Sequence, residues 1–242
     1  MKIAGVELET AEIAGAEPAL VFLHEGLGSV TLWRDFPARL AERTGRRALV
    51  YSRAGHGRSD LPAERRTPRF MHDEALDVLP ELLRVAGIER PVLVGHSDGG
   101  SIALIHASAH PVAGLILLAP HVFVEDVSVA SIAQARETFE TTDLGERMAR
   151  YHRDAERTFR LWNDIWLAPE FRSWNIEDVL GAVTAPTLLI QGVHDQYGTL
   201  AQIEAIERGV RGPVRRAVLG CRHAPHLEAP EETLDAAAEF LS

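Results

Sequence analysis

The chain has 242 residues, of which 46% are hydrophobic and 25% are charged, and its formal net charge is -10. The acidic surplus argues against nucleic-acid binding, because nucleic-acid binders usually carry a basic surface. Cys221 is the only cysteine, which excludes an intrachain disulfide and a thiolate metal cluster. No apolar run approaches the roughly 20 residues that span a bilayer, and the N-terminal residues do not resemble a signal peptide. We therefore expect a soluble, cytoplasmic enzyme-sized α/β protein without a membrane span, and the sequence is compatible with a homodimer.

Short apolar runs rich in β-branched residues predict the strands in chain order. An alternating run at 2–8 predicts an exposed edge strand, and 214–220 predicts a late strand. Nearly continuous apolar runs predict strands buried on both faces at 19–24, 47–52, 91–96, 114–119 and 186–191. Helical patterns lie between them, at 31–45, 72–87, 99–110 and 229–241. This alternation predicts a mostly parallel, twisted sheet with helices on both faces.

One interval interrupts the alternation of strands and helices. Residues 120–185 carry helical patterns and no convincing core strand. Within them, Phe159, Trp162 and Trp166 have the spacing of one helix face. We interpret 120–185 as a helical cap inserted into a core formed by 1–119 and 186–242.

A serine stands in a tight turn between a predicted strand and a predicted helix. The segment Gly95-His96-Ser97-Asp98-Gly99 matches the pattern G-x-S-x-G, with the strand before it and the helix after it. Such a turn lifts the serine hydroxyl off the sheet, and the helix N-terminus behind it favours negative charge. The alternative interpretation is a glycine turn in which the serine is only a helix cap.

Further motifs follow the order found in one large family. They are "HEGLGS" at 24–29, "SRAGHGRSD" at 52–60, the serine turn, "QGVHDQYG" at 191–198 and "CRHAPHLEAPE" at 221–231. On these residues the sequence resembles the α/β-hydrolase superfamily over nearly its whole length, and most of all its small capped esterases, lactonases and C–C hydrolases. The resemblance implies an α/β-hydrolase fold and a Ser-His-Asp triad.

A serine nucleophile needs a base, and histidine has a suitable pKa. The chain has 11 histidines, so position has to decide between them. The resemblance points to His223, in the loop before the last helix, although Arg222 stands where relatives usually have glycine. His226 is the competing candidate, and its alternative role is to fix the loop.

The base in turn needs an acid that orients its ring. The resemblance points to Asp195, in the loop after the strand at 186–191. Asp126 follows the preceding strand, where some relatives place their acid. Charges at the start of the cap, such as Glu125 and Asp126, also suit helix capping.

An oxyanion hole requires backbone donors beside the serine. One is the N–H of Asp98, and the resemblance places the other in the loop His24-Glu25-Gly26-Leu27-Gly28. Relatives usually read H-G-x-G there, so Glu25 is a departure. We favour the N–H of Gly26, with Leu27 as its neighbour.

The substrate pocket is predicted from Asp98 and from residues of the cap. Asp98 either complements the helix dipole or provides a counter-charge for a cationic substrate group. Aromatic and histidine side chains are candidates to line the pocket, or else to pack within the cap: His121, Phe159, Trp162, Trp166 and Trp174.

These residues together predict a serine hydrolase that cleaves small or medium carboxylic esters, or related acyl compounds, through an acyl-enzyme. The histidines show no paired metal-ligand spacing, so we expect neither a metal nor a cofactor, only a small ester-like substrate and water. Alternatives that keep the triad are a C–C bond hydrolase or a perhydrolase. An alternative of another class is a ligand receptor with residual hydrolase activity.

Overall fold

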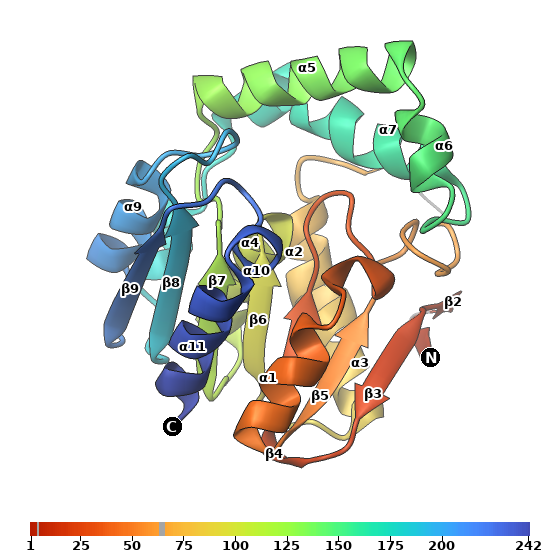
Figure 1. The fold of residues 1–242 in the computed structure, drawn as a ribbon. Coiled ribbons are helices and arrows are strands. Elements are labelled where there is room, and N and C mark those ends of the chain that lie inside the picture. Colours follow the sequence, from red (N-terminus) through yellow and green to blue (C-terminus); the bar gives the residue numbers. More distant parts are fainter. Residues whose placement is uncertain (4, 63–65) are drawn as a thin grey trace.

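A twisted seven-stranded sheet forms the centre of the protein in a computed structural model that describes residues 1–3, 5–62 and 66–242 (Figure 1). Neighbouring strands are parallel, except that the edge strand β3 runs antiparallel to β5. In spatial order the strands are β3 (Thr10–Ile13), β5 (Arg46–Tyr51), β4 (Ala16–Leu23), β6 (Val92–His96), β7 (Gly114–Leu118), β8 (Thr187–Gly192) and β9 (Val214–Leu219). The predicted α/β class with a mostly parallel sheet is confirmed.

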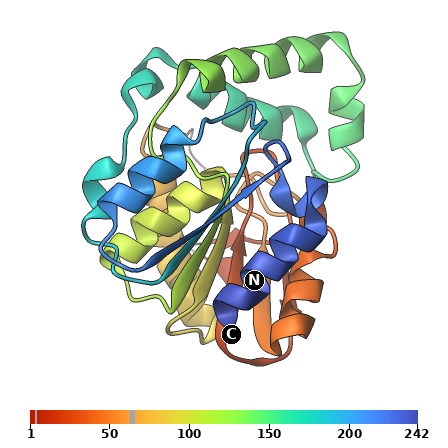
Figure 2. The same ribbon diagram turned by 60° about the vertical axis from the view of Figure 1, so that its left-hand side comes forward.

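Helices cover both faces of the sheet, which is why its central strands are continuous apolar runs. On one face α1 (Phe36–Thr44) and α11 (Pro230–Leu241) pack on the sheet, with η1 (Thr31–Trp33) and α10 (Pro225–Glu228) near their ends. The other face is covered by α2 (Phe70–Asp73), η2 (Glu74–Val78), α3 (Leu79–Ala86), α4 (Asp98–Ala109), α8 (Glu177–Leu180) and α9 (Ala201–Gly209) (Figure 2). Each face thus has its own apolar core, and every residue of β6, β7 and β8 is buried.

The N-terminal segment differs from its prediction. Residues 2–8, expected as one edge strand, contain two short antiparallel strands, β1 (Lys2–Ile3) and β2 (Val6–Glu7), while residue 4 lies outside the described part. Gly5 has a φ of 86°, which suits a tight turn between them. The edge of the main sheet is formed instead by β3, whose residues follow directly along the chain.

Most of the segment 120–185 lies above the carboxyl ends of the strands (Figure 1). It contains α5 (Asp126–Thr141), α6 (Leu144–Met148), α7 (Ala155–Trp166), η3 (Pro169–Ser173) and α8, and all its residues belong to the described part of the chain. Figure 1 shows α5, α6 and α7 spread over the edge of the sheet where the loops gather. A bridge between Phe123 and Asn175 brings the two ends of the segment together. Among the described residues, no helix has the length and apolarity needed to cross a membrane.

Candidate active site

Ser97 occupies a strained turn at the end of β6, directly before α4. Its φ of 54° and ψ of -118° lie outside the regions that residues with a side chain normally adopt, which costs on the order of 1–3 kcal/mol. The glycines around it permit this turn because a Cβ on Gly99 would lie 1.9 Å from the carbonyl oxygen of Leu23. A Cβ on Gly95 would lie 2.4 Å from the carbonyl oxygen of Gly99. The sequence pattern around Ser97 is therefore required by close backbone contacts.

A cavity of about 190 Å³ lies between this turn and the helices above it. Its walls come from the loop after β4, from the serine turn, from α5 and α7, and from the loops after β7, β8 and β9. The lining residues are Glu25, Gly26, Leu27, Ser97, His121, Ser128, Ile132, Trp162, Trp166, Tyr197 and His223. Ser97 and His223, which are far apart in sequence, thus face the same space.

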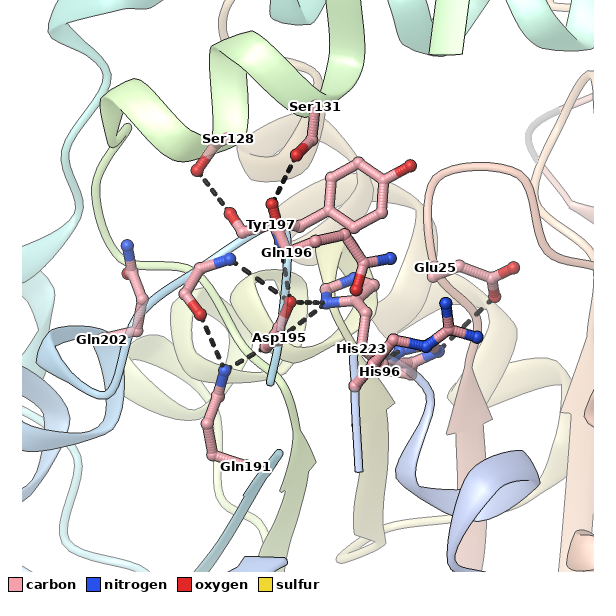
Figure 3. Close-up of polar contacts among 12 residues, drawn as sticks. Glu25, His96, Ser128, Ser131, Gln191, Asp195, Gln196, Tyr197, Gln202 and His223 are labelled. Carbon is pink, nitrogen blue, oxygen red and sulfur yellow. Dashed lines mark hydrogen bonds and ion pairs between the residues drawn. The ribbon is translucent and has the colours of Figure 1, made fainter. Parts of the chain in front are cut away.

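His223 is paired with Asp195 at one side of this cavity (Figure 3). The Nδ1 atom of His223 lies 2.9 Å from both carboxylate oxygens of Asp195. The carboxylate also accepts hydrogen bonds from Nε2 of Gln191 at 2.7 Å and from the backbone N–H of Tyr197 at 2.7 Å. With Nδ1–H donated to Asp195, the Nε2 atom of His223 is the ring nitrogen left for other chemistry.

The Asp195 side chain is 1% exposed and stays in the ionised form. Burial, the largest influence, raises its pKa, but the hydrogen bond and charge of His223 and the N–H of Tyr197 together lower the pKa below its ordinary value. An ionised acid at this position holds the imidazole in one tautomer and favours its protonated form.

The competing candidates for the base and the acid, His226 and Asp126, do not line the cavity. His226 does not line the cavity; its ring packs against Trp33, with ring centroids 4.8 Å apart, and burial lowers its pKa to about 3. Asp126 begins α5 and forms an ion pair with Arg172. His226 is therefore a buried packing residue, and Asp126 is a charge at a helix start.

The loop after β4 brings two of the expected backbone donors to the cavity. Gly26 and Leu27 both line it. Nη2 of Arg53 donates to the carbonyl oxygen of Glu25 at 2.8 Å, and Nε2 of His56 donates to that of Gly26 at 3.0 Å. Within the described residues, no acceptor pairs with the backbone N–H of Gly26, Leu27 or Asp98. Two of these three unpaired donors, those of Gly26 and Leu27, belong to residues of the cavity wall.

The side chain of Asp98 is fully buried and does not belong to the cavity wall. Its Oδ1 accepts from Nε1 of Trp166 at 3.1 Å, and its Oδ2 lies 3.8 Å from Nη2 of the buried Arg53. Burial, the largest influence, raises the pKa of Asp98, while Arg53, Arg66 and Trp166 partly oppose this rise. The carboxylate that the sequence suggested as a counter-charge for a cationic substrate group thus faces a cation of the protein itself, Arg53.

The aromatic candidates divide into two groups. Trp162 and Trp166 line the cavity, as does His121. Phe159 and Trp174 do not, because Phe159 stacks on Phe139 at 4.0 Å between ring centroids and Trp174 stacks on Phe171 at 5.3 Å. Helical spacing identifies the buried face of α7 but not which neighbour each ring meets.

Some wall residues were not singled out as pocket residues from the sequence. Tyr197 stands two residues after Asp195, so its position in the same loop was a usable signal. Ser128 and Ile132 lie four residues apart on α5, which is the spacing of one helix face. In the described part of the chain, no three His, Cys, Asp or Glu side chains are grouped so that they could hold a metal ion.

Comparisons with known proteins match this architecture. A sequence model of the alpha/beta hydrolase family matches residues 20–236. The sn-1-specific diacylglycerol lipase ABHD11 of Mus musculus is 26% identical over 255 residues, covering 93% of this chain and 81% of the mouse protein. Among solved structures, an esterase from Exiguobacterium antarcticum has a TM-score of 0.77 at 21% identity, covering 99% of this chain and 97% of that chain. The enol-lactonase from Burkholderia xenovorans LB400 has a TM-score of 0.77 at 21% identity, covering 99% and 98%.

Proposed function

Because this chain belongs to the alpha/beta hydrolase family, we propose that it is a serine hydrolase that cleaves small or medium carboxylic esters, or related acyl compounds, through an acyl-enzyme on Ser97. One observation carries the proposal. Ser97, His223 and the free N–H groups of the loop after β4 face one cavity, and His223 is held by the buried Asp195.

In the proposed mechanism, Nε2 of His223 takes the proton of the Ser97 hydroxyl as the oxygen attacks the ester carbonyl. The imidazolium is stabilised by Asp195 and then gives its proton to the leaving alcohol. Water enters, is deprotonated by His223 and attacks the acyl-enzyme, so that the acid leaves and Ser97 regains its proton. Each half-reaction begins and ends with neutral His223 and ionised Asp195.

The negative oxygen that develops in each half-reaction would be bound by the N–H of Asp98 and by that of Gly26 or Leu27. These donors sit on a rigid turn and on a loop anchored by Arg53, so little reorganisation is needed when the charge appears. A single donor of this kind contributes on the order of a hundredfold in rate.

The cavity wall supports substrates with a compact apolar acyl group. Ile132, Trp162 and Trp166 provide apolar contact, and a volume of about 190 Å³ accommodates a group of a few carbon atoms or a small ring. Several similar proteins carry names of enzymes acting on ester bonds, namely an esterase, an enol-lactonase and a diacylglycerol lipase. In this proposal residues 120–185 act as a cap that excludes water and selects the acyl group by shape.

The experiment that tests this function combines turnover with active-site labelling. Wild-type protein is expected to hydrolyse p-nitrophenyl acetate and to react with a fluorophosphonate, and Ser97→Ala is expected to lose both. Ser108→Ala, which removes a hydroxyl from the far end of α4, serves as the control and is expected to retain both. Full activity and labelling in Ser97→Ala would show that another residue is the nucleophile. Turnover of ring-cleavage diketones and not of esters would favour C–C bond hydrolysis.

A further inference from the structure

A chain of polar contacts joins Glu25, His96 and the main chain of His223 behind the proposed catalytic residues (Figure 3). Nε2 of His96 lies 2.7 Å from the carbonyl oxygen of His223. On the other side of the ring, Nδ1 of His96 lies 3.7 Å from Oε2 of Glu25. The chain therefore runs from the loop after β4, through the residue preceding Ser97, to the loop after β9.

The contact between Nε2 of His96 and the carbonyl oxygen of His223 determines where one ring proton of His96 lies. A carbonyl oxygen only accepts hydrogen bonds, so Nε2 of His96 must carry a proton and donate it. In a neutral ring Nδ1 would then present a lone pair to the Glu25 carboxylate, which is a repulsive arrangement. Nδ1 is buried and has no hydrogen-bond partner among the described residues. A second ring proton, between Nδ1 and Oε2, turns this repulsion into an ion pair.

The other groups around His96 do not replace Glu25. Its ring packs against those of Trp33, His223 and His226, with centroids 6.3, 5.1 and 5.0 Å away. His226 stays neutral because burial lowers its pKa to about 3. For Glu25, burial is the largest influence and raises the pKa, but contact with His96 lowers it well below the ordinary value.

The loop geometry accommodates the Glu25 carboxylate. A Cβ on Gly28 would lie 2.2 Å from Oε2 of Glu25, so glycine at 28 leaves the space that the carboxylate occupies. The carbonyl oxygen of Glu25 is meanwhile bound by Nη2 of Arg53 at 2.8 Å and by the N–H of Gly28 at 3.1 Å. The main chain of Glu25 is thus held by two hydrogen bonds, directly beside Gly26 and Leu27, while its carboxylate lies against Nδ1 of His96.

We propose that Glu25 and His96 form a positioning pair: Glu25 holds a proton on Nδ1 of His96, and the Nε2–H of His96 holds the His223 main chain. The pair keeps the loop after β4, the serine turn and the loop after β9 at fixed distances from one another. The inference rests on the proposed function, because it assigns the pair its effect through Ser97 and His223. A misplacement of about 1 Å between such groups can lower the rate by 10²-fold.

Two measurements test the pair. The first is the ¹⁵N–¹H spectrum of the histidine rings at pH 7, with the His96 signals assigned by their loss in His96→Gln. We expect two ring N–H signals from wild-type His96 and only the Nε2–H signal in Glu25→Gln. A single ring N–H on wild-type His96 overturns the proposal, and this readout needs no substrate.

The second measurement is the rate at Ser97. Glu25→Gln is expected to lower kcat for p-nitrophenyl acetate and the fluorophosphonate labelling rate about tenfold, with KM within twofold of wild type. The matched control is Glu170→Gln, which removes one exposed negative charge on the helical segment and is expected to change neither rate. His96→Gln provides a second test if Glu25→Gln folds poorly. It is likewise expected to lower kcat about tenfold and to leave KM within twofold of wild type. Rates within twofold of wild type in both variants overturn the proposal, whereas an unreactive wild-type Ser97 would instead refute the proposed function.

Discussion

Trp166 on α7 donates its indole N–H to Oδ1 of Asp98, 3.1 Å away. The contact joins the helical segment above the sheet to the residue that directly follows Ser97. Because Oδ2 of Asp98 also faces Arg53, the same carboxylate links α7, the serine turn and the loop after β5. The position of α7 over the cavity and the geometry of the serine turn are therefore fixed together.

Trp166→Phe is predicted to destabilise the protein by about 1–3 kcal/mol more than a matched Trp→Phe change, because it leaves a buried carboxylate without its hydrogen-bond donor. The measurement is urea unfolding at neutral pH. Trp174→Phe is the matched control, since Trp174 is also buried but its Nε1 has no hydrogen-bond partner in the described structure. Equal losses of unfolding free energy in the two variants would show that the hydrogen bond between Trp166 and Asp98 contributes nothing to stability.

Gly26→Ala is predicted to lower the fluorophosphonate labelling rate of Ser97 by at least about tenfold. A Cβ at this position would lie 2.1 Å from Cδ1 of Trp162, so either the loop after β4 or the Trp162 ring on α7 must move. The loop carries the proposed oxyanion donors, and their displacement weakens binding of the developing charge. Gly181→Ala is the control, because nothing lies within 4 Å of its added Cβ. An unchanged labelling rate in Gly26→Ala would argue against this loop as part of the oxyanion hole.

The hydroxyls of Ser128 and Ser131 on α5 are predicted to hold the loop that carries Asp195. They donate to the carbonyl oxygens of Tyr197 and Gln196, as Figure 3 shows. The double change Ser128→Ala with Ser131→Ala should lower Tm by about 4–8 °C, on the basis of about 1 kcal/mol per hydrogen bond. It should also lower kcat/KM for p-nitrophenyl acetate.

The control for that double change lies on the same helix. The hydroxyls of Thr138 and Thr141 donate to carbonyl oxygens within α5 itself, so these hydrogen bonds do not hold the Asp195 loop. Changing both threonines to Ala should leave kcat/KM within twofold of wild type. An equal loss of activity in the two double variants would mean that α5 acts through its own stability and not through the loop.

The stability of the protein is predicted to fall as the pH is lowered from about 6.5, partly because of His226. Burial, assisted by His96 and His223, lowers the pKa of His226 from its ordinary value of 6.5 to about 3. Between these values the unfolded chain binds a proton that the folded protein does not bind. The contribution of neutral His226 to the free energy of unfolding is therefore fully present above pH 6.5. It is lost towards pH 3, by about 1.4 kcal/mol per pH unit.

Urea unfolding between pH 7 and pH 4 measures this dependence. His226→Gln should show a shallower fall than wild type, since the glutamine does not take up a proton in that range. His194→Gln, which changes an exposed histidine, should keep the wild-type slope. Parallel curves for all three proteins would contradict the assignment of His226 as a neutral buried residue.

Much of the fold and part of the candidate site could be predicted from local sequence. Strands buried on both faces require continuous apolar runs, so the central strands could be recognised in the sequence by such runs. The glycines around Ser97 were visible because the turn leaves no room for side chains. The prediction that residues 2–8 form the edge strand was wrong. Both 2–8 and Thr10–Ile13 have sequences suited to an edge strand, and the pairing of Thr10–Ile13 with β5 decides which one joins the main sheet.

Contacts between distant segments could not be predicted in the same way. The partner of Asp98 is Arg53, in the loop after another strand, and nothing in the residues next to Asp98 indicates it. Phe159 and Trp162 share one helix face, yet only Trp162 reaches the cavity because Phe139 covers the Phe159 ring. Such outcomes depend on how the helices pack above the sheet.

Ser97 is proposed to carry the acyl group during turnover. Rapid acid quenching of the reaction with p-nitrophenyl acetate, followed by mass spectrometry of the peptides, tests this proposal most directly. We predict one acetyl group on the peptide that contains Ser97, absent in Ser97→Ala and accumulating during the initial burst. An acetyl group on a different residue, or continued turnover with no acetylated peptide at any time, would contradict the acyl-enzyme mechanism.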